Sequence, residues 1–223
     1  MQRVHEQLLD AALAERHRIV SRRGLLSGGI KIGIGGALAM SALGSPALGK
    51  AMAAVAKAQD FKDDVDVLNY ALTLEHLEYA FYRDGIDQFT FGSDPFGTSI
   101  DEYLALVRDH EGAHVDTLTK VITDLGGEPV EEATYDFGYG ADAQKFLATA
   151  AALENTGVMA YDGAGRFLKS ADLLTAAGGI VAVEARHASY LNLVTGEIPF
   201  PGGFEQAKTK AEILEIAGPF ITS

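Results

Sequence analysis

The sequence predicts an all-α protein whose main part is a bundle of four helices. Beyond residue 60, four long segments carry apolar residues at alternating steps of three and four, which places those residues on one face of an α-helix. Stretches that contain glycine, serine and proline separate these segments. No segment alternates apolar and polar residues in the way that a half-buried strand does.

Capping residues and helix breakers set the expected bounds of the helices. Thr98 or Ser99 is a suitable N-cap for the second helix, with Glu102 near the capping-box position. Gly126 ends that helix, and Gly196 ends the fourth one. The four long helices and a short amphipathic one near the C-terminus are therefore expected at residues 63–89, 99–126, 141–169, 172–195 and 205–216.

Length and composition allow one good-sized core and an appendage. We expect an N-terminal segment at residues 1–53, the four-helix bundle at residues 54–200, and a tail with the short helix at residues 201–223. The 223 residues include no cysteine, which excludes disulfides, thiolate metal sites and cysteine nucleophiles. A transition metal must therefore be bound by His, Asp, Glu or backbone oxygen, a set that suits iron, manganese or zinc.

The net charge of −13 is distributed unevenly along the chain. Residues 1–50 hold seven Lys and Arg against three Asp and Glu, a balance of +4. Residues 51–223 hold eleven against twenty-eight, a balance of −17. A body this acidic repels phosphate backbones, so the composition argues against nucleic-acid binding.

The basic front segment resembles an export signal. Ser21-Arg22-Arg23-Gly24-Leu25-Leu26 is similar to the twin-arginine signature, and a glycine-rich apolar stretch follows at residues 24–49. We therefore expect export by the twin-arginine route to the periplasm or another extracytoplasmic space. Small residues between Leu48 and Ala54 offer cleavage positions. The alternative is an uncleaved anchor, because residues 24–49 are long enough to cross a bilayer.

Each helix carries one glutamate near the middle of its apolar face, and two helices add a histidine three residues later. On the second helix, Glu111 and His114 interrupt an apolar series that runs from Ile100 to Leu125. The fourth helix repeats this E-x-x-H pattern. The six residues are Glu75, Glu111, His114, Glu154, Glu184 and His187.

This pattern predicts a centre of two divalent metal ions. A spacing of three places Glu and His on one helix face, so that both side chains can bind one metal. Four carboxylates inside a bundle would repel one another, and two divalent cations supply the missing positive charge. Glu111 and Glu184 are the natural bridging ligands, with Glu75 and Glu154 terminal. Glu78 remains an alternative to Glu75, because it lies one turn further on.

Residues adjoining the six ligands are expected to play lesser parts. Glu78, if it is not a ligand, belongs next to the ligands or on the surface. His76 and His110 adjoin ligand positions and should point away from the centre. Tyr82 and Tyr161 each follow a glutamate by seven residues, so we expect them in the core with the hydroxyl near the site.

The same motifs resemble the ferritin-like domain family that includes desiccation-related and stress-response proteins. The resemblance covers roughly residues 61–200 and rests on Leu74-Glu75-His76-Leu77-Glu78-Tyr79, His110-Glu111-Gly112-Ala113-His114, Leu153-Glu154-Asn155-Thr156-Gly157 and Val183-Glu184-Ala185-Arg186-His187. It implies an up-down-down-up four-helix bundle and a di-iron or di-manganese centre. It implies no settled reaction.

Two classes of function follow from these expectations. In the first, the centre is a redox-active oxidoreductase of the ferroxidase, peroxidase or catalase kind, with dioxygen or peroxide as its partner. In the second, the protein is a non-enzymatic envelope or stress scaffold with a structural metal or none. A homo-oligomer fits either class, although a mineral-storing cage is less compatible with a membrane-spanning front segment.

Overall fold

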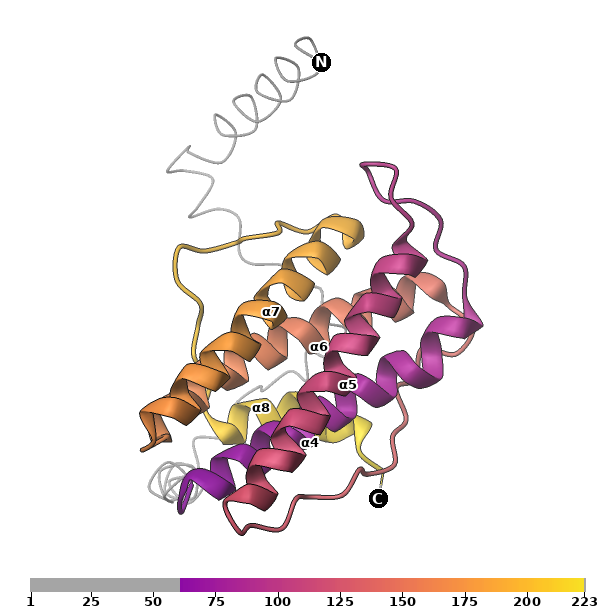
Figure 1. The fold of residues 1–223 in the computed structure, drawn as a ribbon. Helices are drawn as coiled ribbons and strands as arrows, with labels where there is room; N and C mark the ends of the chain where they lie inside the picture. Colours follow the sequence, from indigo (N-terminus) through magenta and orange to yellow (C-terminus); the bar gives the residue numbers. More distant parts are fainter. Residues whose placement is uncertain (1–60, 223) are drawn as a thin grey trace, which may run out of the picture. The chain divides into compact units, whose positions relative to one another are not determined.

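The computed structural model describes residues 61–222, which form four long helices and one short one (Figure 1). The expected export signal lies outside these residues. The described part contains no strand beyond isolated bridges. In chain order the elements are α4 (Asp64–Gly85), η1 (Ile86–Gln88), α5 (Ile100–Asp124), α6 (Ala143–Ala164), η2 (Gly165–Phe167), α7 (Ala171–Thr195), α8 (Lys210–Ala217) and η3 (Gly218–Phe220).

Contacts between helix ends give the direction of each helix. Gly127, just past α5, lies against Val65 at the start of α4, so these two helices are antiparallel. The backbone N–H of Lys169, after α6, donates to the Asp64 carboxylate, so α6 ends where α4 begins. The helix α7 then returns along α6 to bring Tyr190 onto Tyr103 near the start of α5. The expected up-down-down-up order is confirmed.

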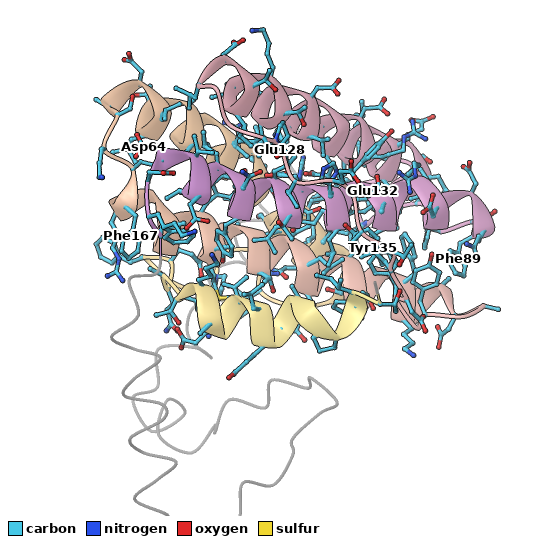
Figure 2. All side chains as sticks on the ribbon, turned by 90° about the horizontal axis from the view of Figure 1, so that it is seen from below. Asp64, Phe89, Glu128, Glu132, Tyr135 and Phe167 are labelled. Carbon is cyan, nitrogen blue, oxygen red and sulfur yellow. The ribbon has the colours of Figure 1, made fainter. Side chains whose placement is uncertain are left out.

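The connection between α5 and α6 runs along the whole length of α4. Figure 2 shows Glu128, Glu132 and Tyr135 spaced along that helix between Asp64 and Phe89. The Asn69 side-chain amide donates to the Glu128 carbonyl and accepts from the Val130 N–H. An antiparallel α5–α6 pair would need only a short turn, whereas this connection is long and is held along α4 by these contacts. The long crossover therefore makes α5 and α6 run in the same direction.

Each long helix begins at a side-chain cap. Asp63, Ser99, Asp142 and Ser170 accept hydrogen bonds from backbone N–H groups in the first turn of the helices that follow them. Three expected bounds were wrong. The helix α4 ends at Gly85, not at residue 89, because the chain continues as the 3-10 helix η1. The helix α6 ends at Ala164, not at Lys169, because η2 tightens its last turn. The short helix begins at Lys210, where Thr209 and Glu212 form a capping box.

Two hydrophobic clusters make up the core, and the glutamates lie between them. On α5, Leu104 and Val107 belong to the larger cluster and precede Glu111. Leu118 and Ile122 belong to the smaller cluster and follow it. Leu125, expected in the same apolar series, is 50% exposed because it lies beyond the end of α5. The charged layer is therefore closed on both sides by apolar side chains.

The C-terminal segment packs against the bundle. Its Lys208 N–H donates to the Met159 carbonyl of α6, and Thr222 pairs with Thr134 of the crossover. A Cβ atom at Gly163 would lie 1.8 Å from the Lys208 carbonyl oxygen, so only glycine allows this approach.

Within residues 61–222, none of the helices combines the length and the apolar character needed to cross a bilayer.

Candidate metal centre

All six residues expected at a metal centre lie at one level of the bundle and are buried. The four glutamates are 0% exposed, and the two histidines are almost as deeply buried. Each occupies the apolar face of its helix midway along, so helix packing brings the side chains together from α4, α5, α6 and α7. The structure thus gathers the predicted residues from positions up to 112 residues apart in the chain, from Glu75 to His187.

Three carboxylates surround one nitrogen of His114. Its Nδ1 atom lies 3.1 Å from Glu75 Oε2, 3.1 Å from Glu111 Oε2 and 3.1 Å from Glu184 Oε1. A single N–H can point at only one of these oxygens. The convergence of four donor atoms on one small space is what a cation requires.

A second group forms around His187. Its Nδ1 atom lies 3.0 Å from Glu111 Oε1 and 3.1 Å from Glu154 Oε2. Glu184 completes this group, so Glu111 and Glu184 belong to both groups, whereas Glu75 and Glu154 each belong to one. This distribution is the one that two bridging and two terminal carboxylates would show; ligation itself remains a prediction.

The donor set fits metal ions better than it fits an ordinary polar core. Glu111 Oε1 and both oxygens of Glu184 are buried without a hydrogen bond of acceptable geometry among the described residues. Buried carboxylate oxygens without a donor are costly, and native cores rarely keep them. A divalent cation between the helices would satisfy these oxygens together with the two imidazoles.

Two tyrosines hold the carboxylates of Glu154 and Glu75 from across the bundle. Tyr82 of α4 donates from its hydroxyl to Glu154 Oε1 at 2.6 Å. Tyr161 of α6 donates in the same way to Glu75 Oε1. The exchange is reciprocal between α4 and α6. It follows an internal repeat, in which α4–α5 and α6–α7 each carry a glutamate, a tyrosine seven residues later and an E-x-x-H motif. The expectation that both hydroxyls lie near the site is confirmed.

Glu78 is a fifth buried carboxylate beside the six residues. It is 2% exposed, so the possibility of a surface position was wrong. Its side chain and that of Glu184 both lie against Gly157 of α6. A Cβ atom at Gly157 would be 2.9 Å from Glu78 Oε1 and 3.4 Å from Glu184 Oε2. The glycine, unfavourable in mid-helix by about 1 kcal/mol, makes room for both carboxylates.

His110 connects the cluster to the surface. Its Nδ1 lies 2.9 Å from His187 Nε2, and the two rings are nearly parallel, at 10°. If His187 binds a metal through Nδ1, its Nε2 carries the ring proton and donates a hydrogen bond to His110 Nδ1. The matching position before Glu184 is Val183, which has no side-chain acceptor. The two halves of the cluster are therefore not equivalent.

Burial and mutual repulsion make the metal-free cluster hold protons. Burial, helped by the Glu111 charge, raises the pKa of Glu75 to about 7, although the hydrogen bond from His114 opposes the rise. Burial and neighbouring carboxylates also raise the pKa of Glu78 and Glu184 well above the usual range. Burial alone would lower the pKa of His187, but the contacts with Glu111 and Glu154 raise it to about 9. Metal binding must displace these protons.

A family comparison agrees with the fold. The model of the ferritin-like domain matches residues 63–197, from the cap of α4 to the end of α7. The chain belongs to the ferritin-like domain family. All six predicted residues of this ferritin-like protein lie inside the matched region.

More distant comparisons add little. The comparison with curated proteins finds no significant match. Among solved structures, the chain is similar to a conserved hypothetical protein of Mycobacterium tuberculosis at 21% identity. The match has a TM-score of 0.49 and covers 62% of this chain and 94% of that one. A likeness this distant has no bearing on function.

Sequence reasoning missed the roles of two neighbours of the six residues. Periodicity predicts that His110 points away from the core, and it does, yet its ring still contacts His187 on α7. The available signal was the residue directly before each E-x-x-H motif, which is histidine before Glu111 and valine before Glu184. For Glu78 the sequence held no such signal, because Gly157, which makes room for it, lies on another helix.

Proposed function

We propose that this ferritin-like protein binds two iron or manganese ions and uses them in redox chemistry with dioxygen or peroxide. The observation that carries the proposal is the shared pair of carboxylates: Glu111 and Glu184 belong to both candidate metal groups. Two such metals, when bound, supply electrons in pairs to a small oxidant. Ferrous iron is the natural substrate if the reaction is of the ferroxidase kind.

The protein's own residues have distinct parts in this function. Glu111 and Glu184 hold the two metal positions together. Tyr82 and Tyr161 orient the terminal carboxylates through hydrogen bonds, which fixes the oxygens left for a metal. Apolar side chains on both sides of the cluster limit the access of water.

The test measures metal content first and reactivity second. We expect about two iron or manganese ions per chain after loading, and oxygen consumption when ferrous iron is added. Glu111→Ala with Glu184→Ala should lose metal binding and keep the helical circular-dichroism spectrum, because fewer carboxylates then repel one another. Glu102→Ala with Glu215→Ala changes two exposed glutamates and serves as the control.

Two results would contradict the proposal. Two metals still bound to the Glu111→Ala, Glu184→Ala variant would refute the assignment of the bridging residues. A fully loaded native protein that reacts with neither dioxygen nor peroxide would favour the second class, a scaffold with a structural metal.

We also propose that the protein acts outside the cytoplasm. The support is the motif Ser21-Arg22-Arg23 and the glycine-rich apolar stretch after it, which lie outside the described residues. The twin-arginine route carries folded proteins, so a metal could be inserted before export. The same stretch would serve as the membrane attachment if it is not cleaved.

A further inference from the structure

A small cavity lies among the four helices on the side of the cluster where α4 begins and α5 ends. Its volume is about 40 Å³. All four long helices contribute to its wall. The residues that matter here are Ala71 and Leu118, Tyr161 and Ala164, and Ala177 and Ile180.

The cavity adjoins the His114 group. Ala71, Leu118 and Ile180 lie four residues from Glu75, His114 and Glu184, about one helical turn along each helix. Tyr161 lines the cavity while its hydroxyl donates to Glu75. One side chain thus separates the cavity from a candidate metal ligand.

Small side chains at core positions leave this space open. Ala71, Ala164 and Ala177 face the bundle interior where larger residues would fill the layer. Protein cores seldom keep voids larger than a water molecule. Thr117 and Ala176 belong to the wall and are exposed, so the wall reaches the surface on α5 and α7.

The wall of the cavity is almost wholly apolar, and this selects the kind of molecule that enters. Water needs two to four polar partners to occupy a buried site, and hydrogen peroxide also loses hydrogen bonds there. Dioxygen loses none. The volume exceeds the ~10–15 Å³ that one water molecule needs on the same measure and is far below the ~150 Å³ of a cavity that holds benzene. A diatomic gas fits, and a longer apolar substrate does not.

We propose that this cavity holds dioxygen beside the His114 group and that dioxygen, not peroxide, is the oxidant that reaches the centre from this side. The inference rests on the proposed redox function. It also makes a claim about the metal-free protein, namely that the cavity takes up a small apolar atom or molecule.

The first experiment uses xenon on the purified full-length chain without metal. Xenon should bind at this cavity in pressurised crystals, or shift the ¹²⁹Xe resonance in solution. Ala177→Leu should abolish binding by filling the space, and Ala164→Val provides a second filling variant should the first fail to fold. Ala113→Leu, on the exposed face of α5, is the control and should bind xenon as the native chain does. Absence of xenon from the native cavity would overturn the inference, whatever the metal does.

The second experiment uses metal-loaded protein and ferrous iron. The filling variants, checked for native metal content, should raise the KM for dioxygen at least fivefold, whereas Ala113→Leu should leave it unchanged. An unchanged KM in a folded variant that no longer binds xenon overturns the cavity's role and leaves the proposed function intact. A loaded native protein that consumes no oxygen but reacts with peroxide would overturn the choice of dioxygen and leave the proposed redox function intact. Reaction with neither oxidant would overturn the proposed function.

Discussion

At the scale of single residues, the cluster combines an internal repeat with a local break in that repeat. Glu75 and Glu154 each accept from a tyrosine of the other half, so these two positions are matched. His110 has no counterpart, because the second motif carries Val183 at that place. A twofold pattern of candidate ligands therefore contains two unlike candidate metal positions.

We predict that His110→Ala weakens one of the two metal positions. Without the acceptor at His110, the Nε2–H of His187 loses the partner that sets its tautomer and ring orientation. Affinity at the His187 position should fall by about 10–100-fold while the His114 position keeps its affinity. Stepwise titration with Mn²⁺ or Co²⁺, monitored by calorimetry, measures the affinities of both positions.

Two further variants separate this effect from general damage. His110→Asn keeps an acceptor oxygen and should restore most of the lost affinity. His76→Ala removes a histidine that contacts the Val130 carbonyl, away from the cluster, and should leave both steps unchanged. Equal weakening of both steps in His110→Ala would show that the residue does not act through His187.

Protonation makes the stability of the metal-free protein depend on pH. The folded pKa of His187, about 9, exceeds the ordinary value of 6.5, so its contribution is complete below pH 6.5 and is lost as the pH rises through 9. The raised pKa of Glu75, about 7, has the same sign. We expect the free energy of unfolding to fall by on the order of 1–3 kcal/mol between pH 6.5 and 9.5.

Thermal unfolding of metal-free and Mn²⁺-loaded protein at these pH values provides the measurement. Bound metal replaces the protons, so the loaded protein should lose less stability and the gain on loading should grow with pH. A metal-free protein that becomes more stable as the pH rises would contradict the arrangement of charges described above.

At the scale of elements, close helix approach depends on glycine at a few positions. The most demanding is Gly163, where the chain before α8 crosses α6 and the Lys208 carbonyl occupies the place of a Cβ atom. The helix α8 itself buries Ile213 and Ala217. The C-terminal segment is therefore held by backbone contact as well as by apolar burial.

We predict that Gly163→Ala destabilises the protein and releases this segment. The new methyl group must displace the Lys208 backbone, at a cost of about 1–3 kcal/mol. Chemical denaturation gives the change in stability, and amide exchange shows whether residues 208–222 lose protection. Gly178→Ala is the matched control. It is a mid-helix glycine with open space around it, so the same change should stabilise by up to about 1 kcal/mol. Equal effects of the two changes would mean that the crossing is not tight.

At the scale of the whole molecule, we propose separate functions for the bundle and the front segment. The bundle contains the candidate metal centre, and residues 21–49 are proposed to act as the export signal. Because the two lie in different parts of the chain, export can be tested without disturbing the centre.

We predict that Arg22→Lys with Arg23→Lys retains the protein in the cytoplasm with its bundle folded. The change keeps the charge but removes the arginine pair on which the route depends. Cell fractionation locates the protein, and the intact mass of exported native protein shows where it begins. A start between Leu48 and Ala54 fits cleavage, whereas a full-length mass in the membrane fraction fits an anchor. Undiminished export of the double variant would exclude the twin-arginine interpretation.

The sequence by itself determined the helices and the composition of the central layer. A helix repeats every 3.6 residues, so apolar periodicity reveals the inward face, and polar residues on that face stand out. For this reason Glu111, His114, Glu184 and His187 could be recognised from spacing alone. The order of helices needed the family resemblance, because periodicity does not say how a long crossover turns.

Tertiary structure alone decided which side chains of different helices contact one another at the cluster. Periodicity describes one helix at a time and does not show which residues of two helices meet. The burial of Glu78 against Gly157, the contact of His110 with His187 and the pairing of Tyr82 with Glu154 all join different helices. The cavity has the same origin, since it forms only where the alanines of several helices meet in one layer.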